Sequence, residues 1–439
     1  MSQLAVDSGQ VPEGYKQTEV GVIPNDWELS DIESVSLVPT QNGLFFEPKR
    51  KGKGIPLINV SDMYSSAPIQ IENLDLFDAN ISEVKTFQAV SGDLFFTRSS
   101  VVPTGIAYCN IFLNEEVKAV FDSHLIRVRP NTNLVDSSFL YLNCIFSYAR
   151  KFLISSAKTA IMTTIDQKAI NGCPVLLPPR HEQTAIANAV SDIDTLITSL
   201  EKLIAKKRAI KTATMQQLLT GKKRLPEFER HPNGELKGYK QSELGGIPED
   251  WILPKLGDFC TLINGRGFKP HEWESEGLPI IRIQNLNGSE EFNYYSGHYD
   301  PKIFVEPNQL LFAWSGSRGT SFGPHIWRGG NALLNYHTWK LVVDHSKVDE
   351  NFFYHALKAL TKQIEDSAHG ASALVHTQKG EMEQFYVPLP PTRKEQTAIS
   401  EALSDIDHTL SLLEYRLAKT QQLKQGMMQE LLTGRTRLI

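Results

Sequence analysis

Apolar residues recur at alternating steps of four and three along two stretches of the chain. They are Ile186, Val190, Ile193, Ile197, Leu200 and Ile204 in the first stretch, and Ile399, Leu403, Ile406, Leu410, Leu413 and Leu417 in the second. This spacing is typical of a coiled-coil seam. A Pro-Pro pair precedes each stretch and Gly221 or Gly434 ends it, so the pattern predicts two long helices, within residues 178–221 and 390–439. In the second, Thr392 and Glu395 have the spacing of a capping box.

The two predicted helices are copies of one sequence. Residues 182–225 (EQTAIANAVSDIDTLITSLEKLIAKKRAIKTATMQQLLTGKKRL) and 395–438 (EQTAISEALSDIDHTLSLLEYRLAKTQQLKQGMMQELLTGRTRL) are identical at 23 of 44 positions without a gap. Residues 14–27 (GYKQTEVGVIPNDW) are likewise repeated at 238–251 (GYKQSELGGIPEDW). A lone apolar heptad would favour an ordinary core helix. Duplication, paired boundary signals and a length of roughly 55 to 60 Å favour a spacer instead.

The duplication divides the chain into six segments. They are an N-terminal tail with its lead-in (1–27), a first body (28–177), the central helix (178–221), a linker with the second lead-in (222–251), a second body (252–389) and the C-terminal helix (390–439). The bodies share only a skeleton of short strands, glycine-bearing turns and one late helical stretch, at 139–154 and 352–364. In that skeleton Thr97 and Arg98 align with Ala313 and Trp314. The fold class is therefore α+β, with two pseudo-repeated α/β domains joined by two long helices.

Composition places the chain among globular proteins. It has 439 residues, 41% of them hydrophobic and 22% charged, and we expect a cytoplasmic protein because neither a run of 18 apolar residues nor a signal peptide is present. The four cysteines form no Cys-x-x-Cys pair, so we expect reduced thiols. The net charge of −5 alone argues against nucleic-acid binding. Local basic patches, or a partner that supplies positive charge, would remove that objection.

Motifs of catalysis are missing from the sequence. It contains no Gly-x4-Gly-Lys-Ser/Thr loop, no Asn-Pro-Pro-Tyr of an adenine methyltransferase, no His-Glu-x-x-His, no Gly-x-Ser-x-Gly and no metal-spaced Cys/His cluster. We therefore predict a chain that has no catalytic residues and binds no metal or cofactor itself.

Two pairs of loops carry residue types that contact DNA. Basic or amide side chains lie on the first pair, before a predicted strand: Lys49, Arg50, Lys51 and Lys53 in the first body, and Asn264, Arg266 and Lys269 in the second. The second pair follows the DLFF and QLLF strands and offers Arg98 and Ser99, and Ser317 and Arg318. The same compositions also suit solvated loops and ordinary turns, so both interpretations stay open.

The duplicated segments resemble a known family, the DNA-specificity subunits of type I restriction-modification enzymes. The resemblance extends from Gly14 to Leu438. Its most specific marks are the two Leu-Pro-Pro-x(2–3)-Glu-Gln-x-Ala-Ile entrances to the helices, each followed by Ser-Asp-Ile-Asp and ending in Leu-Leu-Thr-Gly. The Gly-Tyr-Lys-Gln lead-ins agree as well.

The resemblance implies a division of labour. Each body would be a target-recognition domain for one half of a split double-stranded DNA site. The two helices would pack antiparallel and set the number of unrecognised base pairs between the halves. Two methyltransferase subunits carrying S-adenosylmethionine would dock on the chain, and up to two restriction subunits using ATP and Mg²⁺ would join them. No membrane partner is implied.

Two other classes of function compete with this prediction. One is a non-catalytic assembly scaffold whose two bodies bind proteins rather than DNA. It predicts no sequence-dependent DNA binding even with partners present. The other is a methyltransferase, which would require that the isolated chain bind S-adenosylmethionine.

Overall fold

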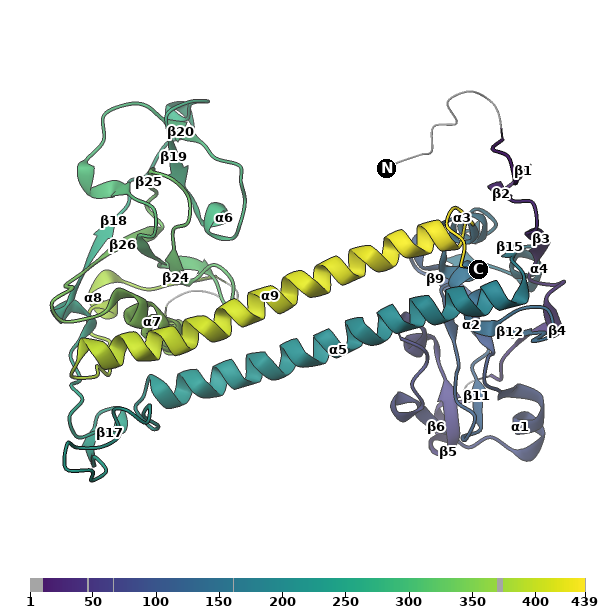
Figure 1. Cartoon of the computed structure of the whole chain (residues 1–439), viewed down its shortest axis with the longest axis horizontal. Coiled ribbons are helices and arrows are strands. Elements are labelled where there is room, and N and C mark those ends of the chain that lie inside the picture. Colours follow the sequence, from purple (N-terminus) through teal and green to yellow (C-terminus); the bar gives the residue numbers. More distant parts are fainter. Residues whose placement is uncertain (1–10, 46, 66, 161, 369–373, 439) are drawn as a thin grey trace. The chain divides into compact units, whose positions relative to one another are not determined.

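A computed structural model describes residues 11–45, 47–65, 67–160, 162–368 and 374–438. The chain forms two compact units. Unit 1 comprises Met1–Glu201 and Tyr415–Ile439, and unit 2 comprises Lys202–Glu414. Each unit therefore contains one body, one half of the first long helix and the opposite half of the second (Figure 1).

Unit 1 is built on two four-stranded sheets. The first has the order β10 (Cys109–Ile111), β8 (Leu94–Thr97), β12 (Leu125–Pro130), β4 (Ser36–Asn42), and the second β6 (Asp75–Phe77), β5 (Lys51–Ile58), β11 (Ala119–Phe121), β7 (Gln88–Ala89). Smaller elements are the hairpin β1 (Tyr15–Thr18) and β2 (Gly21–Pro24), the pair β3 (Glu28–Asp31) and β15 (Pro174–Leu177), and the sheet of β13 (Lys158–Thr159), β14 (Thr163–Thr164) and β9 (Ser99–Ser100). Its helices are α1 (Ile81–Phe87), α2 (Ser137–Ile145), α3 (Ser147–Ser155), α4 (Gln167–Asn171) and the start of α5 (Arg180–Leu218).

Unit 2 repeats the two sheets in the same order. They are β24 (Gly323–Ile326), β22 (Leu310–Ala313), β26 (Thr338–Val343), β18 (Cys260–Asn264), and β20 (Tyr294–Tyr295), β19 (Leu278–Ile281), β25 (Ala332–Leu334), β21 (Phe304–Val305). The remaining strands are β16 (Tyr239–Ser242), β17 (Gly245–Pro248), β23 (Ser315–Ser317) and β27 (Leu374–His376), and the helices are α6 (Ile283–Leu286), α7 (Glu350–Ser367), α8 (Lys379–Met382) and α9 (Arg393–Leu431). A parallel pair of strands also recurs, as β5–β11 and β19–β25. The predicted α+β class with two repeated bodies and two long helices is confirmed.

One predicted helix differs between the repeats. The stretch 352–364 lies within the single helix α7. The stretch 139–154 is instead two helices, because Phe146 adopts an extended conformation (φ −78°, ψ 160°) between α2 and α3. The apolar period continues across the break, so the sequence pattern alone suggested one helix.

Apolar seam residues connect the long helices to the two main cores. Ile186 and Val190 pack with Leu431 and Leu432 in the core of unit 1, and Ile399 and Leu403 pack with Leu218 and Leu219 in that of unit 2. Seven of the twelve predicted seam residues are buried: Ile186, Val190, Leu200, Ile204, Ile399, Leu403 and Leu410. The other five, Ile193, Ile197, Ile406, Leu413 and Leu417, are partly buried. The same ion pair forms once in each unit, between Lys211 and Asp407 and between Lys424 and Asp194, and it shows that α5 and α9 run antiparallel.

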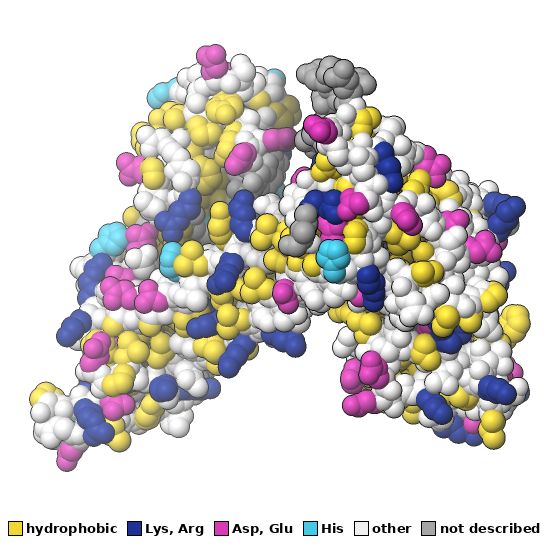
Figure 2. Space-filling view, turned by 45° about the vertical axis from the view of Figure 1, so that its right-hand side comes forward, with side chains coloured by type: hydrophobic (Ala, Val, Ile, Leu, Met, Phe, Trp, Pro, Cys, Tyr) yellow, Lys and Arg dark blue, Asp and Glu magenta, His cyan; other side chains and the backbone are white. Residues whose placement is uncertain are grey.

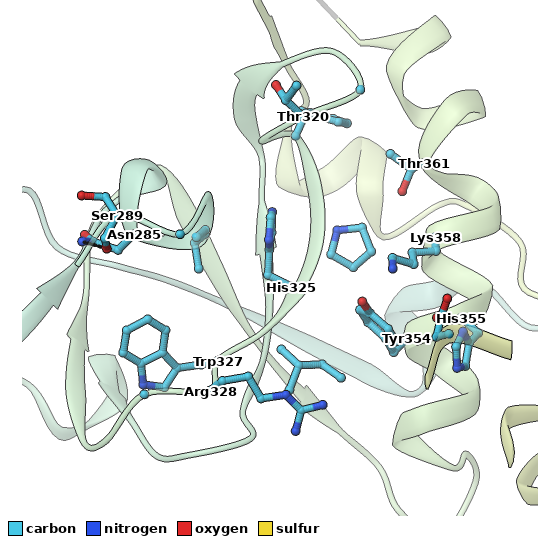
Figure 3. A pocket seen from close by; sticks show the side chains of 18 of the residues that line it. Asn285, Ser289, Thr320, His325, Trp327, Arg328, Tyr354, His355, Lys358 and Thr361 are labelled. Atoms are coloured by element: carbon cyan, nitrogen blue, oxygen red, sulfur yellow. Dashed lines mark hydrogen bonds between the residues drawn. The ribbon is translucent and has the colours of Figure 1, made fainter. Parts of the chain in front are cut away.

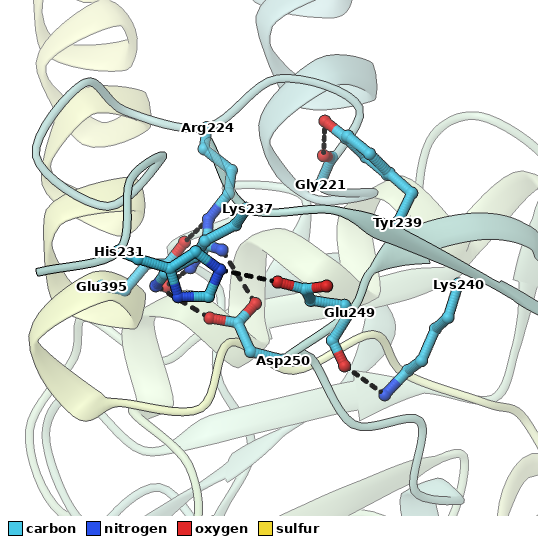
Figure 4. A network of polar contacts seen from close by, with 9 residues as sticks. All are labelled: Gly221, Arg224, His231, Lys237, Tyr239, Lys240, Glu249, Asp250 and Glu395. Atoms are coloured by element: carbon cyan, nitrogen blue, oxygen red, sulfur yellow. Dashed lines mark hydrogen bonds and ion pairs between the residues drawn. The ribbon is translucent and has the colours of Figure 1, made fainter. Parts of the chain in front are cut away.

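The repeated Glu-Gln at each helix entrance has a structural role. Glu395 is 1% exposed and accepts hydrogen bonds from Arg224, whose Nε lies 2.8 Å from Oε1 and whose Nη2 lies 2.5 Å from Oε2. Arg224 also donates to Asp250 at 2.8 Å (Figure 4). The neighbouring Gln396 accepts from the backbone N–H of Asp349, directly before α7. This network holds the segment after α5 against the start of α9, and equivalent residues form the same network in unit 1.

The glycine that ends each long helix is required by its backbone and its surroundings. Gly221 has φ +69° and Gly434 has φ +68°. A Cβ atom on Gly221 would lie 2.4 Å from Pro248, and one on Gly434 would lie 2.5 Å from Pro24. The carbonyl oxygens of both glycines accept hydrogen bonds from tyrosines of the lead-in hairpins, Tyr239 at 3.2 Å (Figure 4) and Tyr15 at 3.1 Å. The repeated Leu-Leu-Thr-Gly and Gly-Tyr-Lys-Gln segments thus contact each other within each unit.

Candidate nucleic-acid interface

One residue in each unit makes the same backbone hydrogen bonds: Arg98, between β8 and β9, and Trp314, between β22 and β23. In unit 1 the N–H of Arg98 donates to the carbonyl of His124 at 2.8 Å, and the Arg98 carbonyl accepts from Ile165 at 3.0 Å. In unit 2 the N–H of Trp314 donates to the carbonyl of His337 at 3.2 Å, and its carbonyl accepts from Thr377 at 3.0 Å. Arg98 and Trp314 are therefore structural equivalents.

Unit 1 presents hydrogen-bond donors at this position. Arg98 is exposed, and among the described residues its guanidinium has no hydrogen bond or ion pair. With Ser99, His124, Lys158 and Thr164 it lines a cavity of about 380 Å³. The ring of His124 is held by Asp122, 2.7 Å from Nδ1 to Oδ1. A charged fork beside a hydroxyl and an imidazole can donate to base edges or to phosphates.

Unit 2 presents aromatic rings at the same position. Trp314 stacks on Trp339, with ring centroids 5.8 Å apart and an interplanar angle of 23°, and meets His337 edge-on at 5.6 Å. Its indole Nε1 donates to the carbonyl of Tyr336 at 2.9 Å. Burial lowers the pKa of His337, so the imidazole is neutral near pH 7. The two units thus carry different chemistry on one backbone frame.

Ser317 is the last residue of β23, and Arg318 follows it, close to α7. One Nη of Arg318 donates to the carbonyl of Glu365 at 2.9 Å, and the backbone N–H of Gly319 donates to the Glu365 carboxylate at 3.0 Å. The N–H of Ser317 bonds to Ser321 Oγ at 2.8 Å. Arg318 is therefore anchored at one nitrogen, and the rest of its guanidinium is not engaged by the described residues.

The basic loop of unit 1 is largely neutralised by carboxylates. Arg50 ends the short 3-10 turn Pro48–Arg50, where it pairs with Glu83 and lies 4.6 Å over the ring of Phe77. Two further ion pairs follow on β5, Lys51 with Asp75 at 2.7 Å and Lys53 with Asp78 at 2.9 Å. Lys49 is exposed, and no ion pair to it is found within the described part of the chain. The structure thus gives Arg50 a role in attaching β5 to α1.

The matching segment of unit 2 is also held by its neighbours. Asn264, at the end of β18, accepts from the indole N–H of Trp339. Arg266 pairs with Glu272 and lies over the rings of Phe268, at 4.8 Å, and Tyr295, at 5.0 Å. Lys269 is exposed, and its backbone N–H donates to Glu272. Among the described residues, no hydrogen bond or ion pair links this segment to Ser317 or Arg318.

A larger polar cavity lies in unit 2, between α7, β24 and the turn after α6. Its volume is about 990 Å³, and Figure 3 shows His325, Tyr354, His355 and Lys358 around it. The ammonium of Lys358 lies 4.9 Å over the ring of Tyr354. His355 is 2% exposed, and its Nδ1 has no hydrogen-bond partner among the described residues.

Both signs of charge are present on the face drawn in Figure 2, where Lys and Arg side chains are interspersed unevenly with Asp and Glu side chains. Within the described ranges, no group of three or more His, Cys, Asp or Glu residues could hold a metal ion, and no helix is long and apolar enough to cross a membrane.

A sequence model of the family described as the type I restriction modification DNA specificity domain matches residues 24–211 and 248–424. The chain belongs to this family. This chain is 27% identical over 438 residues to a Methanocaldococcus jannaschii protein provisionally named the type I restriction enzyme MjaX specificity subunit. The match spans 97% of both chains. The MjaVIII specificity subunit of the same organism is 25% identical over 342 residues, 75% of this chain and 76% of the relative.

The fold also matches a solved specificity subunit. The crystal structure of the type I restriction-modification system S subunit from M. genitalium superposes with a TM-score of 0.57 at 15% identity, over 92% of this chain and 96% of that one. The protein is thus a non-catalytic specificity subunit with two target-recognition domains. The membership of the specificity-subunit family that the duplicated motifs predicted is confirmed.

Sequence reasoning selected Arg98 and Ser99 and placed Trp314 on the candidate loop of the second body, but it did not select His124 or Lys158. Lys158 is far from Arg98 in sequence and reaches it only through the pairing of β14 with β9. The alignment of Thr97 and Arg98 with Ala313 and Trp314 was the one available signal for the Arg98–Trp314 equivalence.

Proposed function

We propose that each unit recognises one half of a bipartite double-stranded DNA site, through the Arg98 position in unit 1 and the Trp314 position in unit 2. The observation that carries this proposal is the shared backbone frame with different side chains. A frame conserved within one molecule, together with divergent side chains at one strand junction, suits two different half-site sequences. Arg98 suits guanine or phosphate, and stacked Trp314 suits apolar contact with a base.

The residues chosen from sequence form two groups under this proposal. Arg98, Ser99, Ser317 and Arg318 are candidates for base or phosphate contact at the strand junctions. Lys49 and Lys269 are candidates for phosphate contact because both are exposed. Lys51 and Lys53 are candidates because a phosphate can replace the carboxylate in a surface ion pair. Arg50, Asn264 and Arg266 support the loops that carry them.

The long helices set the separation of the half-sites and dock two methyltransferase subunits. A helix of 39 residues rises about 58 Å, more than one turn of duplex DNA. Besides the seam, α5 exposes Leu203 and Ile210, seven residues apart, and α9 exposes Leu412, all three within unit 2. Exposed apolar residues at heptad spacing favour contact with partner helices.

The cofactors belong to the partners in this proposal. S-adenosylmethionine would bind to the methyltransferase subunits, and ATP and Mg²⁺ to restriction subunits where these join. The four buried cysteines are free thiols, which suits the reducing cytoplasm.

A genome-wide map of adenine methylation tests the proposal, in the source cell with the gene, without it, and with the intact gene returned. We expect one split motif, two short defined blocks around an unrecognised gap, to lose methylation and to regain it on complementation. If the chain is instead a scaffold for proteins, the purified complex with its methyltransferase subunits will bind duplexes with and without that motif equally.

A further inference from the structure

Arg127 is a buried cation without an acidic partner. It lies on β12 and is 5% exposed, and its Nε has no hydrogen-bond partner among the described residues. Its guanidinium carbon lies 5.6 Å from the centroid of the Phe121 ring. Burial, and next the charge of Arg129, lower the pKa of Arg127, whereas the charge of Asp93 opposes the shift. Burying an unpaired charge is costly, so the site is incomplete without a counter-charge.

The neighbouring arginine shows what a completed site looks like. Arg129, two residues along β12, donates from Nε and Nη2 to the two oxygens of Asp93, both at 2.8 Å. Asp93 is therefore already engaged by a bidentate pair.

Arg127 lines a cavity of about 450 Å³ formed by β4, β12 and α1. The polar residues around it are Thr40, Gln41, Lys85, Thr86, Gln88, Arg127 and Arg129. Among the described residues that line it, three are cations and none is acidic. Lys85 is exposed at the rim, and within the described structure its ammonium has no ion pair. The cavity therefore combines positive charge with amide and hydroxyl donors around a guanidinium whose Nε lacks a partner among the described residues.

The cation at the equivalent position in unit 2 has a hydrogen-bond partner. Lys340 pairs with Leu311 as Arg127 pairs with Phe95. The Lys340 ammonium donates to the carbonyl of Phe304 at 2.7 Å, so it is satisfied within the fold. The shared frame thus does not require an unpaired cation here, and the feature is specific to unit 1.

We propose that this cavity of unit 1 is a binding site for a phosphate group. The Arg127 guanidinium would donate to two phosphate oxygens, Lys85 would add charge at the rim, and Thr40, Gln41 and Gln88 would complete the hydrogen bonds. The phosphate comes either from the DNA backbone or from a free phosphate-bearing molecule. Only the DNA source rests on the proposed function.

Thermal unfolding of the full-length chain tests the site with inorganic phosphate as the probe, titrated at constant ionic strength. We expect phosphate to raise the unfolding temperature of the wild type along a saturable curve. In Arg127→Met the curve shifts to at least about tenfold higher phosphate, because the bidentate donor is lost. Without phosphate the variant is at least as stable as the wild type, because a buried unpaired charge has been replaced by an apolar side chain.

Two further variants keep the test decisive. Lys85→Ala changes an exposed side chain that does not support the core, and we expect it to weaken the phosphate response even if Arg127→Met fails to fold. Lys340→Met removes a cation at the equivalent position of unit 2, and we expect an unchanged response. Equal phosphate responses in all four proteins would overturn the proposal, as would a loss in Lys340→Met equal to that in Arg127→Met.

Duplex DNA distinguishes the two sources of phosphate. For the chain in complex with its methyltransferase subunits, a backbone phosphate in the cavity predicts that Arg127→Met lowers the salt-dependence slope of duplex binding by about one. An unchanged slope, together with a lost response to inorganic phosphate, would assign the site to a free phosphate-bearing molecule. If the chain does not bind DNA at all, the inorganic phosphate titration still decides whether the site exists.

Discussion

Arg437 donates two hydrogen bonds of 2.7 Å to the two carboxylate oxygens of Glu182, 255 positions earlier in the chain. It also pairs with Asp26 at 2.8 Å. Glu182 is completely buried, and Trp27 Nε1 donates to it as well. Arg437 therefore attaches the segment after α9 to the start of α5 in unit 1, as Arg224 attaches the segment after α5 to the start of α9 in unit 2.

Arg437→Ala should destabilise unit 1 by about 3–5 kcal/mol, because it leaves the Glu182 carboxylate buried without its partner. Urea unfolding of the full chain measures the change. The matched variant Arg224→Ala should affect unit 2 to a similar extent. Arg230→Ala removes an arginine whose side chain is half exposed, and it should change stability by less than about 1 kcal/mol. If Arg437→Ala loses no more stability than Arg230→Ala, the burial of Glu182 does not depend on its pair with Arg437.

His355 should make the stability of unit 2 sensitive to pH. Burial lowers its pKa to about 4, from an ordinary value of 6.5. The charges of Lys358 and Lys211 lower it further, whereas Asp407 opposes the shift. Between these two pH values the unfolded chain takes up a proton that the folded chain does not. Stability is therefore complete above about pH 6.5 and falls toward pH 4, by up to about 3 kcal/mol.

Urea unfolding of the wild type and His355→Gln across that pH range isolates this contribution from other titrating groups. The glutamine should remove part of the pH dependence and preserve a hydrogen bond to Ser404, which lies 3.2 Å from the imidazole Nε2. Parallel stability curves for the two proteins would mean that His355 does not titrate differently on folding.

Partner docking should depend on the exposed apolar residues of the long helices. Leu203 is 39% exposed and Ile210 is 41% exposed on the same face of α5. Leu203→Glu should weaken binding of the methyltransferase subunit by roughly 1.5–3 kcal/mol, since an apolar side chain would no longer be buried on assembly. Isothermal titration with the purified partner measures this. Ala205→Glu adds the same charge at an exposed site almost opposite on the helix, and equal losses in both variants would contradict the assignment.

The long helices could be predicted because their signals are local. The seam period, the Pro-Pro pairs and the terminal glycines lie within or beside each helix. Of the predicted capping box, only the bond to the threonine forms. Thr392 Oγ1 does accept from the N–H of Glu395 at 3.3 Å, but the Glu395 carboxylate bonds to Arg224.

The side-chain partners could not be predicted, because they come from distant parts of the chain. Arg50 resembled a free phosphate contact in sequence, yet Glu83 occupies its guanidinium. Arg224 lies in a stretch whose polar composition indicated only a linker, and it is 7% exposed. Which charges form ion pairs depends on the tertiary structure. A count of basic residues in sequence therefore overestimates the unpaired positive charge.

Base recognition by the two units should be separable. Arg98→Ala should relax one base pair of one half-site by about 1–3 kcal/mol if the guanidinium contacts guanine, and Trp314→Ala should relax only the other half-site. Methylation maps of cells that carry each variant measure both. Arg318→Ala should behave like Trp314→Ala in the half-site that it affects. An equal loss on all sequences would identify the altered residue as a phosphate contact.

The length of the long helices should determine the gap between the half-sites. The ion pairs Lys211 with Asp407 and Lys424 with Asp194 fix the antiparallel register, which makes residues 412–418 the match for residues 200–206. Deleting both heptads keeps the seam in phase and shortens each helix by about 10 Å. At 3.4 Å per base pair the unrecognised gap should shrink by about three base pairs, with both half-sites unchanged. Deleting one heptad alone means that the two equivalent ion pairs can no longer form in the same register, and this variant serves as the control. A methylation map that shows altered half-sites in the double deletion, or an unchanged gap, would exclude the helices as the spacer.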